Sequence, residues 1–119
     1  MNEEDVILLI EDDEDKAELI KSILRQHLRG QIRHIEDGEA AMNFLFSHES
    51  SSTKLILLDL ILPKVDGLEI LKRIKADPVK KLIPVIILTL SSNTQSYIES
   101  LGLQPDGYAH KPISLRDCA

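Results

Sequence analysis

Five side chains able to do chemistry end or directly follow short apolar segments of this 119-residue chain. They are Glu11, Asp12, Asp59, Thr89 and Lys111. Carboxylates held close together repel one another unless a cation lies among them, and oxygen ligands without His or Cys suit Mg²⁺. In such a site a carboxylate can attack a phosphoryl group, while the cations and a hydroxyl donor stabilise the transferred oxygens.

Each of these residues also has an ordinary structural explanation. An acidic residue after a strand often interacts only with the first turn of the next helix. Asp59 could be a helix cap or an edge-exposed residue, Thr89 a simple strand residue, and Lys111 a solvated cation. The chemical interpretation is favoured only if the fold brings all five side chains to one place.

Residues 55–62 organise the predicted fold. They form an apolar run interrupted by Asp59 and ended by Pro63, which is typical of a strand buried on both faces of a parallel sheet. An unpaired carboxylate is costly to bury. We therefore expect Asp59 at the carboxyl end of this strand, beside a compensating cation.

Strand and helix patterns alternate along the whole chain. The predicted strands are 6–10, 32–35, 55–59, 85–89 and 107–110. The predicted helices are 14–28, one from 38 through Ala41 and Leu45, one from 68 through Ile74 that Pro78 ends, and 94–101. Short connections between such elements imply right-handed crossovers and a parallel sheet between helices, with ligands at the carboxyl ends of the strands. This arrangement puts the five side chains on one edge of the sheet.

Two residues indicate where the first predicted helix begins and where it ends. Asp13 is a plausible N-cap, and Gly30 is placed to end the helix. Residues 47–53 are polar and are predicted to form a loop.

The composition indicates a single soluble domain over residues 1–119. The net charge is −6, and no basic cluster suggests direct contact with nucleic acid. The single cysteine, Cys118, fits a reducing compartment. There is no signal-peptide pattern and no long apolar run, so we expect a cytoplasmic protein that does not enter the membrane.

The motifs resemble those of the receiver domain of two-component response regulators over essentially the whole chain. They are VILLIEDDED at 6–15, LILLDLILPKVDG at 55–67, PVIILTLS at 84–91 and GYAHKP at 107–112. The resemblance implies a flavodoxin-like, CheY-like α/β fold, doubly wound around five parallel strands in the order 2-1-3-4-5. The segment 77–82 resembles single-domain regulators of the phytochrome-associated type.

By this resemblance Asp59 is the phosphoacceptor, and Thr89 and Lys111 assist its phosphorylation. Glu11, Asp12, Asp59 and the backbone carbonyl of Ile61 hold Mg²⁺, with Asp12 as a more direct ligand than Asp13. Thr89 and Tyr108 form the conformational switch. The phosphoryl group comes from a sensor histidine kinase or a phosphotransfer protein, and the output is a downstream protein partner or a homodimer. The domain is then no enzyme beyond its own phosphotransfer and dephosphorylation.

Two departures from the family pattern matter. Leu90 follows Thr89 where a smaller residue is usual, which narrows access for phosphate. Ile61 and Ser91 occupy positions that tune dephosphorylation in the family. Because apolar Ile61 cannot orient an attacking water, we expect a longer-lived phosphorylated form.

Two other functions fit part of the pattern. A Mg²⁺-dependent phosphohydrolase of the haloacid-dehalogenase type also uses a strand-end Asp, but needs a second Asp where this chain has Ile61. A pseudo-receiver would bind partners without phosphorylation, which the intact set of acidic residues, Thr89 and Lys111 disfavours.

The last residues have the pattern of a helix start. Ser114 and Asp117 have the spacing of a capping box, but a single turn is too short to be stable. We therefore expect a truncated fifth helix that continues in the natural chain.

Overall fold

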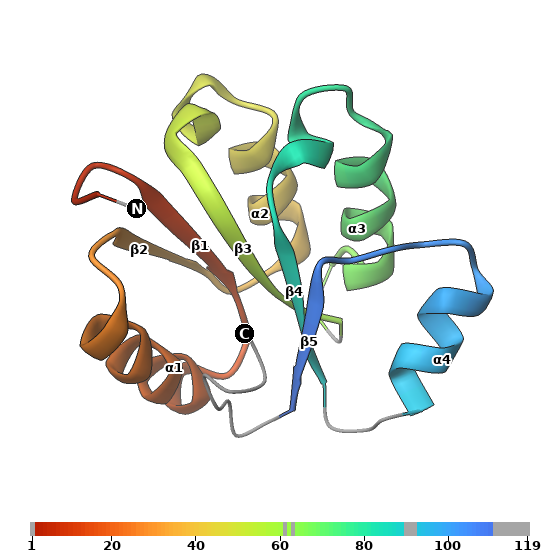
Figure 1. Ribbon diagram of the computed structural model, residues 1–119, viewed down its shortest axis with the longest axis horizontal. Coiled ribbons are helices and arrows are strands. Elements are labelled where there is room, and N and C mark those ends of the chain that lie inside the picture. Colours follow the sequence, from red (N-terminus) through yellow and green to blue (C-terminus); the bar gives the residue numbers. More distant parts are fainter. Residues whose placement is uncertain (1, 61, 63, 90–92, 111–119) are drawn as a thin grey trace.

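The computed structural model describes residues 2–60, 62, 64–89 and 93–110, and its core is a five-stranded parallel sheet (Figure 1). The strands are β1 (Val6–Ile10), β2 (Gln31–Ile35), β3 (Thr53–Asp59), β4 (Val85–Thr89) and β5 (Gly107–His110). Their order is β2-β1-β3-β4-β5. The predicted fold class and strand order are confirmed.

Helices lie on both faces of the sheet. They are α1 (Glu14–His27), α2 (Gly38–Leu45), α3 (Gly67–Ala76) and α4 (Asn93–Ser100), with short 3-10 helices η1 (His48–Ser52) and η2 (Lys80–Leu82). Buried residues of α2, α3 and α4 form one apolar cluster with the sheet. Those of α1 form a second cluster, so α1 covers the opposite face. The central strands are buried on both sides, as their uninterrupted apolar sequences predict.

Aspartates are the N-caps of α1, α2 and α3, each of which follows a strand. The carboxylate of Asp13 accepts a hydrogen bond from the Lys16 N–H at 3.0 Å. The Asp37 carboxylate caps α2 by accepting from the Ala40 N–H, and the Asp66 carboxylate caps α3 by accepting from the Leu68 N–H. Each cap satisfies an amide that the first helical turn leaves unpaired. These caps confirm Asp13 as the N-cap and fix where each chain segment turns back from the sheet.

The end of α1 differs from the prediction. The helix stops at His27, and Leu28 is extended, with φ −126°. Among the described residues the glycine with positive φ is Gly102, which follows α4, and not Gly30. The end of α1 is therefore set by the extended backbone at Leu28 rather than by a left-handed glycine.

The predicted loop at 47–53 contains the 3-10 helix η1, and Thr53 already belongs to β3. The Ser47 hydroxyl accepts from the Glu49 N–H at 3.2 Å. The buried Ser50 hydroxyl donates to the Leu45 carbonyl at 2.8 Å. These serines thus satisfy backbone groups around the end of α2, which is why a polar segment forms an ordered turn.

The predicted fifth helix, Lys111 and Ile61 lie outside the described residues. Within the ranges that the structure covers, none of the helices has the length and apolar character needed to span a bilayer.

Candidate functional site

Three carboxylates meet where β1 and β3 end. One carboxylate oxygen from each of Glu11, Asp12 and Asp59 lies within 4.8 Å of the others. The strand register explains this meeting, because Ile10 pairs with Leu58. Glu11 and Asp59 directly follow this pair, and Asp12 follows Glu11. Glu11 is fully buried and Asp59 is 6% exposed, whereas Asp12 is exposed to solvent. The edge predicted from sequence therefore does bring these three residues together.

The backbone of Asp59 is held on two sides. Asp59 pairs with Leu88 of β4, one residue before Thr89. Behind it lies the start of α3, where the Gly67 N–H donates to the Leu60 carbonyl at 3.1 Å. A Cβ built on Gly67 would stand 2.5 Å from the Asp59 carbonyl oxygen. Glycine is therefore required where α3 begins, a constraint that the sequence pattern does not predict.

Thr89 and Tyr108 lie on neighbouring strands beside this cluster. Thr89, whose backbone alone is described, ends β4 and pairs with His110, while Tyr108 pairs with Ile87. The Tyr108 hydroxyl is buried and has no hydrogen-bond partner among the described residues. Burial, and secondarily the charge of Glu99, raises the pKa of Tyr108.

The Glu11 backbone is held by β2, the neighbouring edge strand. Its N–H donates to the Ile35 carbonyl at 3.1 Å, and its carbonyl oxygen lies 2.7 Å from Nε2 of His34. His34 is not among the site residues predicted from the sequence. The signal that identifies it is the register of the two strands, in which His34 lies opposite Leu9 and so reaches past the end of β1.

The three carboxylates fit a divalent metal ion. The set offers only oxygen donors, which hard cations such as Mg²⁺ and Mn²⁺ accept. Two of the three residues are buried, and buried carboxylates this close to one another are costly unless positive charge lies nearby.

A family model and a curated relative both match this chain and indicate the same family. The sequence pattern described as "Response regulator receiver domain" matches residues 7–118. Response regulator Rcp1 of Synechocystis sp. is 40% identical over 117 residues, which cover 94% of this chain and 80% of Rcp1.

Solved structures agree with the sequence matches. The bacteriophytochrome response regulator AtBRR superposes with a TM-score of 0.88 at 32% identity, covering 98% of this chain and 88% of AtBRR. The Mn²⁺-bound form of Rcp1 superposes with a TM-score of 0.78 at 40% identity, covering 95% of this chain and 85% of the Rcp1 chain. The phosphorylated cyanobacterial phytochrome response regulator RcpA superposes with a TM-score of 0.76 at 34% identity, covering 91% of this chain and 81% of the RcpA chain. The predicted resemblance to phytochrome-associated regulators is therefore confirmed.

Proposed function

Because the chain belongs to the response regulator receiver family of two-component signalling, we propose that Asp59 accepts a phosphoryl group in a Mg²⁺-dependent reaction. The donor is a sensor histidine kinase or a phosphotransfer protein. The observation that carries the proposal is the meeting of Asp59 with Glu11 and Asp12, whose carboxylate oxygens lie within 4.8 Å of one another.

In this proposal Glu11, Asp12, Asp59 and the backbone carbonyl of Ile61 hold Mg²⁺. When bound, the ion supplies positive charge that offsets the repulsion between the carboxylates and the incoming phosphoryl oxygens. The Mn²⁺-bound form of Rcp1, a relative of this chain, supports the binding of a divalent metal ion.

The chain's own residues carry the transfer. A carboxylate oxygen of Asp59 attacks the phosphorus of a phosphohistidine, the P–N bond breaks, and the imidazole nitrogen keeps the bonding electron pair. The product is an aspartyl phosphate. Lys111 pairs with the added charge, and the Thr89 hydroxyl donates a hydrogen bond to a phosphoryl oxygen.

Thr89 and Tyr108 change conformation in response to phosphorylation. Once Thr89 turns toward the phosphoryl group, Tyr108 packs into the space that this movement opens. The buried Tyr108 hydroxyl without a partner in the described part of the chain supports this role, because no hydrogen bond there would have to break. Phosphorylation then shifts the population between two arrangements of one fold, which a downstream protein partner or a second copy reads in the cytoplasm.

Intact mass spectrometry after incubation with phosphoramidate tests this function. With Mg²⁺ the protein should gain a single phosphoryl group, and with a chelator it should gain none. A pseudo-receiver would gain none in either condition. A phosphohydrolase would release phosphate from an aryl phosphate in many turnovers, whereas a receiver should stop at the stoichiometric adduct.

A further inference from the structure

β2 holds both backbone groups of Glu11, although β1 ends one residue earlier at Ile10. The Glu11 N–H donates to the Ile35 carbonyl, as in an ordinary parallel ladder. The Glu11 carbonyl oxygen lies beyond the last residue of β1 and contacts the His34 ring, with Nε2 at 2.7 Å. The His34 side chain thus extends the hydrogen bonding between β2 and β1 beyond the end of the strand.

We propose that His34 is a positioning residue of the cation site, which sets the orientation of the Glu11–Asp12 peptide and through it the Asp12 carboxylate. The inference rests on the proposed function, since it assumes that these carboxylates bind a divalent cation. A carbonyl oxygen only accepts hydrogen bonds, so the contact requires a proton on Nε2 of His34.

The geometry of the peptide explains why this bond affects Asp12. The Glu11 carbonyl, the Asp12 amide and the Asp12 α-carbon belong to one planar unit, so rotation about the Glu11 Cα–C bond moves the carbonyl oxygen and the Asp12 α-carbon together. On the other side, Asp13 is fixed as the N-cap of α1. Asp12 is an exposed residue between these two anchored neighbours. Without His34 one anchor is lost, and the Asp12 carboxylate samples more positions.

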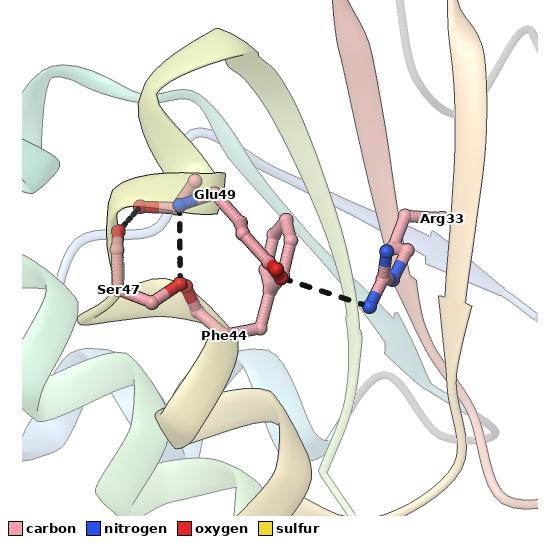
Figure 2. A network of polar contacts seen from close by, with 5 residues as sticks. Arg33, Phe44, Ser47 and Glu49 are labelled. Atoms are coloured by element: carbon pink, nitrogen blue, oxygen red, sulfur yellow. Dashed lines mark hydrogen bonds and ion pairs between the residues drawn. The ribbon is translucent and has the colours of Figure 1, made fainter.

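Neighbouring residues of β2 act on opposite faces of the sheet. Ile32 packs in the cluster of α1, and strand alternation puts His34 on the same face. The Arg33 guanidinium lies instead over the Phe44 ring of α2, 5.0 Å from its centroid, and 3.9 Å from the Glu49 carboxylate. Figure 2 shows the Arg33 side chain directed at Glu49. Arg33 therefore offers a matched control on the same edge strand.

Four variants separate the donor group from the general stability of β2. His34→Gln places an amide N–H the same number of bonds from the backbone as Nε2. His34→Asn keeps an amide that is one carbon shorter. His34→Thr favours strand structure but cannot reach the Glu11 carbonyl, so it tests the proposal even if His34→Asn folds poorly. Arg33→Gln disturbs the opposite face of β2.

Calorimetric titration of each folded variant with Mn²⁺ and Mg²⁺ measures the affinity, and amide hydrogen exchange at Asp12 in metal-free protein measures the order of the peptide. We expect wild-type affinity for His34→Gln and Arg33→Gln, and about tenfold weaker binding for His34→Asn and His34→Thr. Amide hydrogen exchange at Asp12 should be faster than in the wild type only in His34→Asn and His34→Thr.

Two results would overturn the inference. In one, His34→Asn and His34→Thr bind the metal as tightly as the wild type. In the other, His34→Gln binds as weakly as His34→Asn, which would show that the N–H donor is irrelevant. Failure of the wild-type protein itself to bind either metal would instead contradict the proposed cation site.

Discussion

Gly67 lies directly against the backbone of Asp59. A Cβ built on Gly67 would stand 2.5 Å from the Asp59 carbonyl oxygen and 2.5 Å from the α-carbon of Leu60. Both are backbone atoms, which cannot move aside as the end of a flexible side chain can. The start of α3 and the position of the proposed phosphoacceptor are therefore set by one contact.

Gly67→Ala should damage stability and phosphorylation together. We expect a loss of about 2 kcal/mol in the free energy of unfolding, within the range for overpacked sites. Phosphorylation should also slow, because relief of the clash displaces Asp59. Urea unfolding and the initial rate with phosphoramidate measure the two effects.

Gly102→Ala is the control for that variant. Gly102 has φ 77°, but a Cβ there would meet no atom of the described residues within 4 Å. It should cost about 1 kcal/mol through the left-handed backbone alone and leave the phosphorylation rate unchanged. The account of Gly67 fails if Gly67→Ala and Gly102→Ala are phosphorylated equally fast.

Substitutions of Asp12 and Asp13 should affect different properties, Mg²⁺ affinity for Asp12 and the stability of the fold for Asp13. Asp13 caps α1 through the Lys16 N–H, so Asp13→Ala should cost about 1 kcal/mol of stability. Asp12 belongs to the carboxylate cluster, so Asp12→Ala should weaken Mg²⁺ binding much more than Asp13→Ala does. Calorimetric titration and thermal unfolding of both variants check this assignment. Equal loss of Mg²⁺ affinity in the two variants would contradict it.

Asp106 should stabilise the fold in a pH-dependent way. Its carboxylate accepts from the Val85 N–H at 2.8 Å and from Lys75 Nζ at 2.9 Å. Burial, the largest single influence, raises the pKa of Asp106, but these two donors outweigh it and leave the pKa below its usual value. The folded state therefore binds this proton more weakly than the unfolded state does.

The stabilisation should accordingly be complete above the unfolded pKa of about 4 and fade as the pH falls through that value toward the lower folded pKa. We expect Asp106→Asn to cost about 1 kcal/mol at neutral pH, since the side chain is partly solvated. Urea unfolding from neutral pH to about pH 3 measures the difference between wild type and variant. A difference that grows on acidification would refute this interpretation.

Tyr108→Phe should leave the unphosphorylated protein nearly as stable as the wild type. The hydroxyl is buried without a hydrogen-bond partner among the described residues, so its removal breaks no such bond and relieves a desolvated polar group. We expect a change within about 0.5 kcal/mol, measured by urea unfolding. A loss above about 1.5 kcal/mol would mean that the hydroxyl makes a stabilising bond.

The sequence predicts most of the fold because its signals there are local. The apolar runs place all five strands to within a few residues, and Asp13 identifies the start of α1. Parallel strands then bring Glu11, Asp12 and Asp59 to one edge without any knowledge of side-chain packing. Site geometry that follows from topology can thus be predicted from sequence.

What the sequence does not predict depends on contacts between distant residues. The need for Gly67 arises from its approach to Asp59, and the contact of His34 with the Glu11 carbonyl arises from the register of β2 against β1. The 3-10 helix η1 depends on serine hydroxyls that bond to backbone groups near the end of α2. None of these contacts leaves a periodic pattern along the chain.

The position of the phosphoryl group tests the central claim most directly. Protein treated with phosphoramidate and Mg²⁺ is reduced with borohydride, which converts an aspartyl phosphate to homoserine, and is then mapped by peptide mass spectrometry. The account predicts homoserine at Asp59 alone, and no modification in Asp59→Asn protein treated in the same way. Modification at another residue, or equal labelling of the Asp59→Asn protein, would contradict it.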